Sequence, residues 1–373
     1  MVRRGDSSTG AGIQHAVEKG NSYPLPEYTG VKGAVSCVNG TNALHLALIL
    51  VGVDRDSEVI SQPLTFIATA NAIVYTGARP IFIDVDRDTL CLSPSKLKQW
   101  LQTNVELRAS NLKGRNSIVE PQSLNIEPYN RLTGKRISAC LPMRTFGHPC
   151  RIDEIVEICN QYHIPVVEDA AESLGSYYNN RHTGTFGRIG VLSFNGNKVL
   201  TTGGGGMLLF NDEALAKRAK HLSTQAKIPH PWEFSHNEIG YNYRMPNINT
   251  ALGLAQLERL PAFLKSKRQI AEAYKTFFST FMLSEFEASI STLTFVKEPS
   301  NAQSNYWLNC ILLNNKEDRD VFLKYSNENG VMTRPAWTLM NKLPMFNNCQ
   351  TDELTNAKEL EEKIVNIPSS IIK

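Results

Sequence analysis

The sequence has no paired cysteines and no long hydrophobic run, and both absences exclude classes of protein. Its seven cysteines stand singly, without a Cys-x-x-Cys pair, which disfavours a disulfide framework and favours free thiols in a reducing compartment. The longest apolar run, 43–53, contains His45 and is far too short to cross a bilayer. Two arginines near the start are followed by no apolar stretch, which is unlike a signal peptide. We therefore expect a cytoplasmic protein.

Several common catalytic and binding patterns are also missing. None of the eight histidines has His-x-x-x-His or His-Glu-x-x-His spacing, so we expect no metal site. There is no Gly-x-Ser-x-Gly elbow for a serine hydrolase, and the glycines at 203–206 do not form the Gly-x-Gly-x-x-Gly of a dinucleotide site. With 39 Lys and Arg against 36 Asp and Glu, the charge is nearly balanced. We expect neither a nucleic acid nor a membrane partner.

The 373 residues, 42% of them hydrophobic, are enough for two lobes. From residue 34 onward, short apolar strands alternate with helices, which is typical of an α/β fold with a mostly parallel sheet covered on both faces. We expect strands at 34–38, 58–60, 80–84, 137–141, 164–167, 190–194 and 207–210, and helices at 43–51, 65–75, 94–101, 152–162 and 212–222.

Two stretches depart from this alternation. The polar segment 103–135 has little apolar pattern and is interpreted as a long excursion from the alternating pattern or a loop. Beyond about residue 249 we expect a long helix over 251–278, interrupted at Pro261, followed by a smaller α+β lobe. The predicted domains are therefore 1–265, large, and 266–373, small.

Lys198 is the first candidate for chemistry. An apolar strand, Gly190–Phe194, leads into the polar turn that carries Lys198, and four glycines follow at 203–206. Burial disfavours the charged ammonium, and a neutral amine is what Schiff-base chemistry requires. The glycines let a bulky group lie against the main chain. The simpler alternative is a solvated lysine in a glycine loop, which for a lone lysine is the commoner case.

Two further motifs could bind an anion and a cation. Asn39-Gly-Thr-Asn42 lies between a strand and a helix, where free N–H groups and a hydroxyl could hold a phosphate, although a simple helix cap is the commoner explanation. Asp169 follows the apolar strand 164–167 at the edge where open α/β sheets bind ligands. Its partner could be a protonated ring nitrogen or, equally, a structural arginine or helix end.

Single residues add weaker hints. Phe66 could stack on an aromatic ring, but most phenylalanines at such positions belong to the core. Ser193 could reach a phosphate, but a serine in a strand is usually structural. Asn242, in an aromatic loop that starts at Gly240, says little by itself.

Taken together, these segments resemble the DegT/StrS-type sugar-nucleotide aminotransferases, which are pyridoxal 5′-phosphate (PLP) enzymes of the aspartate-aminotransferase fold, fold type I. The resemblance extends from about residue 27 to the end and is specific in the combination of its motifs. They are Asn39-Gly-Thr-Asn-Ala-Leu44, Pro63-Leu-Thr-Phe-Ile-Ala-Thr69, Glu168-Asp-Ala-Ala-Glu-Ser-Leu-Gly175, Ser193-Phe-Asn-Gly-Asn-Lys198, Gly240-Tyr-Asn-Tyr-Arg244 and Ile367-Pro-Ser-Ser370.

The resemblance implies a role for each matching residue. Lys198 would join PLP as a Schiff base, and Asp169 would hold the pyridine nitrogen protonated. Asn242 would reach the phosphate of the partner subunit's cofactor, which implies a homodimer with shared active sites. The remaining cofactor-binding residues would be Phe66 on the ring, Glu172 near the ring hydroxyl, and Gly40, Thr41, Asn42 and Ser193 around the phosphate.

Within the family, three segments suggest a legionaminic-acid-type branch. This branch uses glutamate to aminate C4 of UDP-linked 4-keto-6-deoxy-N-acetylhexosamines. The segments are Thr145-Phe-Gly-His-Pro149, Arg181-His-Thr-Gly-Thr-Phe-Gly187 and Lys227-Ile-Pro-His-Pro-Trp-Glu-Phe234, and the candidate substrate-binding residues are His182, His230 and Arg244.

Three alternatives accompany this prediction. The nearest is a GDP-perosamine-synthase-like activity. The second is a sugar 3-dehydratase, which is disfavoured because those relatives have His where this chain has Lys198. The third is a PLP-binding protein without enzymatic activity that has a regulatory or scaffolding role. Two features depart from the branch: Met1–Gly20 stands where relatives have a longer leading segment, and Arg144 stands where they usually have His.

Overall fold

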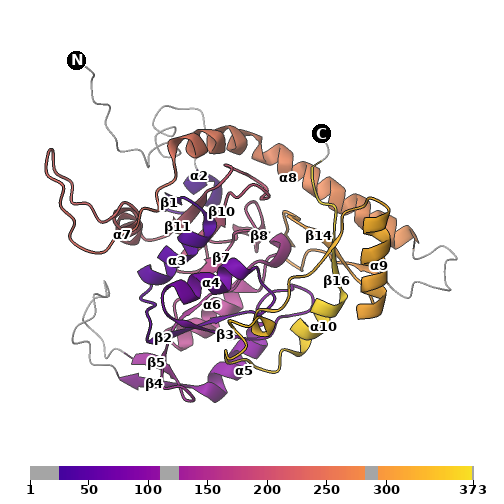
Figure 1. The fold of residues 1–373 in the computed structure, drawn as a ribbon, viewed down its shortest axis with the longest axis horizontal. Coiled ribbons are helices and arrows are strands. Elements are labelled where there is room, and N and C mark those ends of the chain that lie inside the picture. The colour runs from indigo at the N-terminus through magenta and orange to yellow at the C-terminus, as the bar shows by residue number, and fades with distance from the viewer. Residues whose placement is uncertain (1–24, 110–125, 282–292, 372–373) are drawn as a thin grey trace.

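The computed structural model describes residues 25–109, 126–281 and 293–371 (Figure 1). One half of its main sheet has the strand order β1-β11-β10-β7. Strand β11 runs antiparallel to both of its neighbours, whereas β10 and β7 are parallel. The bounds are β1 Gly33–Cys37, β7 Val167–Asp169, β10 Ile189–Ser193 and β11 Gly206–Phe210.

The other half has the order β3-β2-β6-β5-β4, in which β3, β2 and β6 are parallel. Parallel bridges from Cys140 to Val166 and from Met143 to Asp169 connect β6 to β7, so the two halves form one mixed layer. The bounds are β2 Ser57–Ser61, β3 Arg79–Phe82, β4 Val105–Ala109, β5 Ile126–Asn130 and β6 Arg136–Cys140.

Helices cover both faces of this layer, which confirms the expected fold class. One face packs against α3, α4 and α7, and the other against α5, α6 and part of α8. Side-chain alternation in β1 illustrates this, because Val35 and Cys37 join one core and Ala34 joins the other. The bounds are α2 Leu25–Thr29, α3 Gly40–Leu50, α4 Ile67–Tyr75, α5 Pro94–Asn104, α6 Ile152–Gln161, α7 Glu213–Ser223 and α8 Asn247–Phe281.

The expectation of a loop over 103–135 is wrong. Strands β4 and β5 pair antiparallel along five residue pairs and extend the sheet beyond β6. Backbone pairing with an existing sheet edge forms these strands, although the segment has few apolar residues to indicate them. Residues 110–125, in the middle of the segment, lie outside the described residues.

Helix α8 is continuous, so the expected interruption at Pro261 is also wrong. The helix has 35 residues and contains Pro261 in its interior. Proline removes one backbone donor there. Leu257 and Leu260 before the proline are buried in the core, and Phe263 and Leu264 after it pack against the same core, so the helix is held on both sides. The predicted domain boundary at 265/266 falls inside this helix and stays a prediction.

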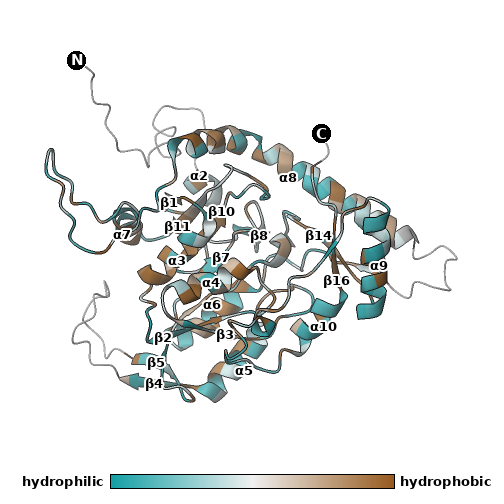
Figure 2. Ribbon diagram, in the orientation of Figure 1, coloured by the Kyte–Doolittle hydropathy of each residue, from teal (hydrophilic) through white to brown (hydrophobic). Residues whose placement is uncertain are grey.

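The C-terminal region contains a second, antiparallel sheet with the order β12-β14-β16-β15. The helices beside it are largely hydrophilic, in contrast to α3 (Figure 2). The bounds are β12 Thr294–Phe295, β14 Asn309–Leu312, α9 Lys316–Glu328, β15 Arg334–Pro335, α10 Thr355–Lys363 and β16 Ile364–Ile367. A small sheet joins the two regions through β8 Tyr177–Tyr178, β9 Arg181–His182 and β13 Ala302–Gln303.

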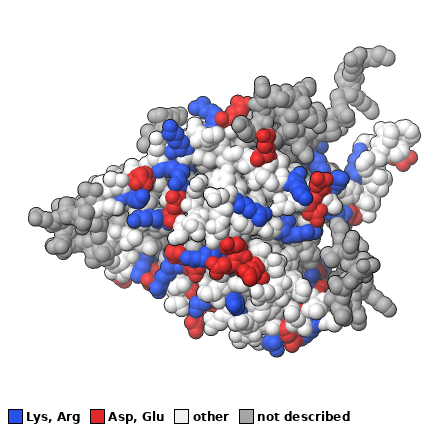
Figure 3. Space-filling model, turned by 180° about the vertical axis from the view of Figure 1, so that it is seen from behind, with Lys and Arg blue, Asp and Glu red and all other residues white. Residues whose placement is uncertain are grey.

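The charged side chains are mixed in sign on the face in Figure 3, where basic and acidic groups lie next to one another. Among the helices of the described ranges, none is both long and apolar enough to cross a membrane. The leading segment Met1–Gly20, expected to replace a longer one, lies outside the described residues.

Candidate active site

A cavity of about 1520 Å³ lies at the carboxyl ends of β7 and β10 and at the start of α3. This is the edge at which α/β sheets bind ligands. The main sheet contributes Asp169 and Ser193 to its wall, and the C-terminal region contributes Trp307, Arg334 and Trp337. Both parts of the chain are therefore needed to form the cavity.

Lys198 lies in the cavity wall between a carboxylate and an aromatic ring. Its Nζ atom is 3.1 Å from Oε1 of Glu172 and 3.8 Å from the centroid of the Trp307 ring. The Trp307 ring is held in turn, because its Nε1 donates to the Asn197 carbonyl at 2.7 Å. The side chain of Lys198 is 10% exposed. The arrangement thus presents one amine to the cavity from a largely buried position.

Asp169 also lines the cavity and is 2% exposed. Thr69 donates its hydroxyl to Oδ2 at 2.7 Å, and the Ala171 N–H donates to Oδ1 at 3.1 Å. Burial raises the pKa of Asp169, and these two hydrogen bonds and the charges of Lys198 and Arg144 oppose the rise. An acid with little access to water that faces a cavity is suited to hold a cationic ligand atom.

Glu172 is the third titratable group of the site. Burial raises its pKa to about 7 against the opposing charge of Lys198. Its Oε2 atom accepts from the Phe146 N–H at 3.0 Å, and its Oε1 atom accepts from Lys198. A carboxyl group with a pKa near neutrality can take up or release a proton beside the amine.

The start of α3 forms an anion cradle. The Asn39 side chain caps the helix by accepting the Asn42 N–H at 2.8 Å, so this N–H is already used. The first-turn N–H groups of Gly40 and Thr41 have no intrahelical acceptor. A Cβ atom on Gly40 would lie only 2.8 Å from Cβ of Ser193, so the glycine lets Ser193 pack against the helix start. Backbone donors, a hydroxyl and the helix dipole together suit a phosphate.

Aromatic side chains complete the wall. Phe66 precedes α4 and remains 46% exposed, with its ring centroid 6.0 Å from that of Trp337. Sequence reasoning missed Trp307 and Trp337 because they lie in the C-terminal region, far along the chain from Lys198. It also missed the role of Thr69, although Thr69 closes a motif that had been recognised. These residues become visible only once long-range contacts are known.

Four candidate residues lie elsewhere. His182 is buried away from the cavity, with Nε2 accepting from the Gly175 N–H at 2.9 Å and Nδ1 lying 2.5 Å from the Thr183 carbonyl oxygen. Both ring nitrogens are therefore occupied. The others, His230, Asn242 and Arg244, are exposed in or beside the loop that projects next to α7 (Figure 1), and none lines this cavity.

His148, a buried residue outside the set of candidate site residues, allows a test of stability against pH. Neither ring nitrogen has a partner among the described residues, and burial lowers its pKa to about 4. As the pH falls below about 6.5, this histidine therefore takes up a proton in the unfolded chain but not in the folded chain. The free energy of unfolding consequently decreases as the pH falls from about 6.5 to 4. We expect the free energy of unfolding of His148→Phe, measured relative to wild type, to be about 2 kcal/mol higher at pH 5 than at pH 8.

The measurement is denaturant unfolding of both proteins at the two pH values. Comparing the variant with wild type cancels the opposite contribution of Glu172, whose raised pKa favours the folded state as the pH falls. His182→Phe is the contrasting variant, since it loses two hydrogen bonds and should be less stable than His148→Phe at both pH values. Burial lowers the pKa of His182 to about 4 as well, so its stability relative to wild type should rise from pH 8 to pH 5 in the same sense. A stability gap for His148→Phe that is equal at pH 5 and pH 8 would contradict the account.

The residues present fit PLP. The cradle at Gly40 and Ser193 suits its phosphate, the exposed ring of Phe66 suits its pyridine face, Asp169 suits a protonated ring nitrogen, and Lys198 offers an amine to its aldehyde. Among the described residues, no cluster of three His, Cys, Asp or Glu side chains could hold a metal ion.

Comparison with known proteins gives consistent matches. The model of the DegT/DnrJ/EryC1/StrS aminotransferase family matches residues 23–109 and 117–371. The chain is 38% identical over 323 residues to EpsN of Bacillus subtilis (strain 168), named as a pyridoxal phosphate-dependent aminotransferase, covering 86% of this chain and 74% of that protein. It is 36% identical over 344 residues to the GDP-perosamine synthase of Escherichia coli O157:H7, covering 92% and 82%.

Solved structures agree in fold. The crystal structure of a DegT DnrJ EryC1 StrS aminotransferase from Brucella abortus aligns with a TM-score of 0.78 at 23% identity, covering 96% of this chain and 89% of that one. At this identity the match supports the fold alone.

Proposed function

Because the chain belongs to the DegT/DnrJ/EryC1/StrS aminotransferase family, we propose that it transfers an amino group from glutamate to C4 of a nucleotide-linked 4-keto-6-deoxy-(N-acetyl)hexosamine. The chain is a PLP-dependent aminotransferase of a family of sugar aminotransferases. The proposed product would serve the synthesis of nonulosonic acids or surface polysaccharides. The observation that carries the proposal is that Lys198 and Asp169 line one cavity, together with the anion cradle of α3.

The proposed chemistry divides between cofactor and chain. When bound, PLP supplies the carbonyl carbon that accepts and returns the amino group, and the ring that accepts the electron pair. The chain's Asp169 holds a proton at the ring nitrogen. The Lys198 amine would take a proton from Cα of glutamate, acting as base, and would deliver it to C4′ of the cofactor, acting as acid. Glu172 lies close enough to exchange a proton with Nζ of Lys198.

The cavity offers space and charge for large anionic substrates. Its volume of about 1520 Å³ exceeds the roughly 300–1000 Å³ of typical small-molecule pockets, which suits a nucleotide sugar beside a cofactor. Two further cations, Lys267 and Arg334, lie in its wall, and neither forms an ion pair with an acid in the described ranges. This charge suits both the diphosphate of the sugar substrate and the carboxylates of glutamate.

A cytoplasmic homodimer is part of the proposal. The loop over 225–242 stands away from the main body (Figure 1), and its most exposed large apolar side chains are Trp232, Phe234 and Ile239, at 75%, 80% and 84%. Large apolar side chains on a projecting loop suit burial against another surface. A second copy of the chain would cover them and would place Asn242 toward the neighbouring cavity.

A second candidate function has its own support. The relative from E. coli O157:H7, 36% identical, is named GDP-perosamine synthase, and relatives of the same name occur at 32% and 28% identity. The same site chemistry would then act on a GDP-linked 4-keto sugar. The two candidates differ in the nucleotide and in the substituent at C2, not in the residues that hold the cofactor.

A substrate panel separates them. Purified protein with PLP and [¹⁵N]glutamate is incubated with UDP- and GDP-linked 4-keto-6-deoxy sugars, and the products are analysed by mass spectrometry. Transfer of ¹⁵N to a UDP-linked N-acetylhexosamine is expected. Transfer to the GDP-linked sugar alone would favour the second candidate. Covalently bound PLP without transfer to any sugar would instead favour an inactive, regulatory homologue. Lys198→Ala serves as the inactive control.

A further inference from the structure

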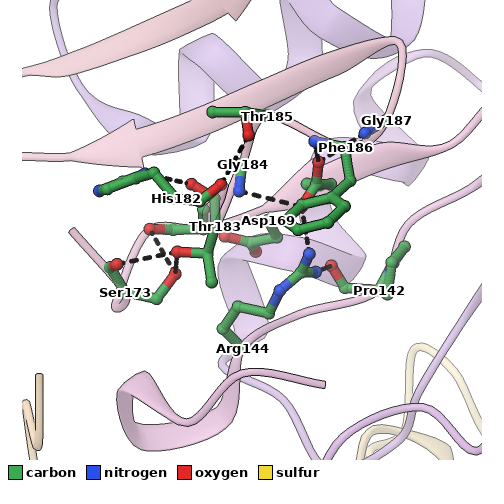
Figure 4. A network of polar contacts seen from close by, with 12 residues as sticks. Pro142, Arg144, Asp169, Ser173, His182, Thr183, Gly184, Thr185, Phe186 and Gly187 are labelled. Carbon is green, nitrogen blue, oxygen red and sulfur yellow. Dashed lines mark hydrogen bonds and ion pairs between the residues drawn. The ribbon is translucent and has the colours of Figure 1, made fainter. Parts of the chain in front are cut away.

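A buried arginine lies behind Asp169 and outside the cavity wall. The side chains of Arg144 and Glu168 are both 0% exposed, and they form an ion pair (Figure 4). Nη1 of Arg144 donates to the Pro142 carbonyl at 3.2 Å, whereas its Nε has no acceptor among the described residues. A buried cation is tolerated only beside an opposite charge. The ion pair therefore constrains the two backbone segments that carry Arg144 and Glu168.

Glu168 is held by backbone donors as well as by the guanidinium. Its Oε1 accepts from the N–H groups of Phe186 and Gly187, both at 2.6 Å, and its Oε2 accepts from the Gly184 N–H at 2.9 Å (Figure 4). Four donors on one carboxylate leave the side chain no freedom to move. Because Glu168 directly precedes Asp169, this arrangement fixes the end of β7.

The backbone around Arg144 holds Asp169 from the other direction. The Arg144 N–H donates to the Asp169 carbonyl at 3.1 Å, and the Asp169 N–H donates to the Pro142 carbonyl at 3.0 Å. The Pro142 carbonyl thus accepts from both the Asp169 backbone and the Arg144 side chain. A change in the guanidinium would be transmitted directly to the backbone that carries the Asp169 carboxylate.

Charge adds to this mechanical connection. The groups that act on the Asp169 carboxyl are the Thr69 hydroxyl and the Ala171 N–H, which donate to it, and the charged side chains of Lys198, Glu172 and Arg144. Lys198 gives up its positive charge when its amine serves as a base, whereas an arginine does not deprotonate in a protein. Arg144 then remains as the permanent cation of this set. A nearby positive charge lowers the proton affinity of an acid.

We propose that Arg144 is a positioning residue that acts through Asp169: it fixes the carboxylate at the end of β7 and keeps it ionised, so that the shared proton stays on the PLP ring nitrogen. This inference rests on the proposed role of Asp169. It assigns no contact between Arg144 and either substrate. Its consequence is that loss of the guanidinium charge shifts the proton from the ring nitrogen toward the carboxylate.

The test uses the holoenzyme loaded with PLP that carries ¹⁵N in its ring. The ¹⁵N NMR signal of that atom reports its protonation directly, and titration with PLP gives the Kd. Arg144→Met removes the charge. Because it leaves Glu168 buried without its partner, the double variant Arg144→Met/Glu168→Gln removes both charges together. Arg188→Met is the matched control, since Arg188 pairs with Asp212 at an exposed position.

We expect the signal of a protonated nitrogen in wild type and in Arg188→Met. In Arg144→Met the signal should move toward that of an unprotonated nitrogen, and the Kd for PLP should rise about tenfold. The double variant should shift in the same direction but by less, because the negative charge of Glu168 is lost as well. A folded double variant with an unchanged signal and Kd would overturn the inference and leave Arg144 a purely structural residue. Asp169→Asn distinguishes failure of this inference from failure of the proposed role of Asp169. If the ¹⁵N signal is unchanged in Asp169→Asn as well, the proposed role of Asp169 itself fails.

Discussion

Lys198→Ala is expected to abolish covalent attachment of PLP and to lower the rate of amino transfer by about 10⁴-fold or more. The amine is the group that would both join the cofactor and move the proton, and each role contributes orders of magnitude to the rate. Alanine leaves Glu172 without the cation 3.1 Å away, so PLP should still enter the cavity but bind reversibly. Single-turnover kinetics with glutamate and gel filtration under denaturing conditions measure the two effects.

A second lysine in the same wall provides the control. Lys267 is buried, its Nζ donates to the carbonyls of Trp307 and Ser369 at 3.0 and 2.8 Å, and burial lowers its pKa to about 8. A lysine with a lowered pKa is a plausible rival for the same chemistry. Its hydrogen bonds to backbone carbonyls instead indicate a structural role. Lys267→Met should therefore lower stability and retain covalent PLP. Loss of covalent PLP in Lys267→Met together with its retention in Lys198→Ala would contradict the assignment.

Asp169→Asn is expected to retain covalent PLP and to lose turnover by roughly 10²- to 10³-fold, the range for removing one preorganised electrostatic group. The amide is nearly isosteric, and its oxygen can still accept one of the two hydrogen bonds now made by Thr69 and Ala171. It has no negative charge to keep a proton on the ring nitrogen. The measurement is kcat at saturating glutamate, together with the amount of PLP bound per chain.

Thr69→Val is the matched control for this loss. It removes one hydrogen bond of 2.7 Å to the Asp169 carboxylate and leaves the charge in place. We expect a decrease of about tenfold, in line with the loss of one hydrogen bond to a charged group. A turnover of Asp169→Asn that is equal to or higher than that of Thr69→Val would show that the charge of Asp169 is unimportant.

The sequence was most informative where the pattern is local. Apolar strands alternating with helices were enough to predict the strands of the main sheet other than β4 and β5, because each of those strands carries its own periodicity. The same holds for Lys198 and Asp169, since Asp169 ends β7 and Lys198 follows β10, and the ends of such strands meet at one edge of the sheet.

The sequence was least informative where the contacting segments lie far apart along the chain. The β4–β5 hairpin lies in a polar segment, and only contact with β6 makes it part of a sheet. The continuous course of α8 through Pro261 depends on packing on both sides of the proline. Trp307 and Lys267 reach the site through folding of the C-terminal region, and no local motif indicates their approach to Lys198.

Borohydride reduction of the PLP-loaded protein, followed by peptide mass spectrometry, tests the central claim most directly. Reduction makes the bond between PLP and its amine permanent, so the modified peptide identifies the amine. The cavity wall contains two lysines among the described residues, Lys198 and Lys267. We expect the mass of the reduced cofactor on Lys198 alone. The same mass on Lys267, or on neither lysine, would contradict the account.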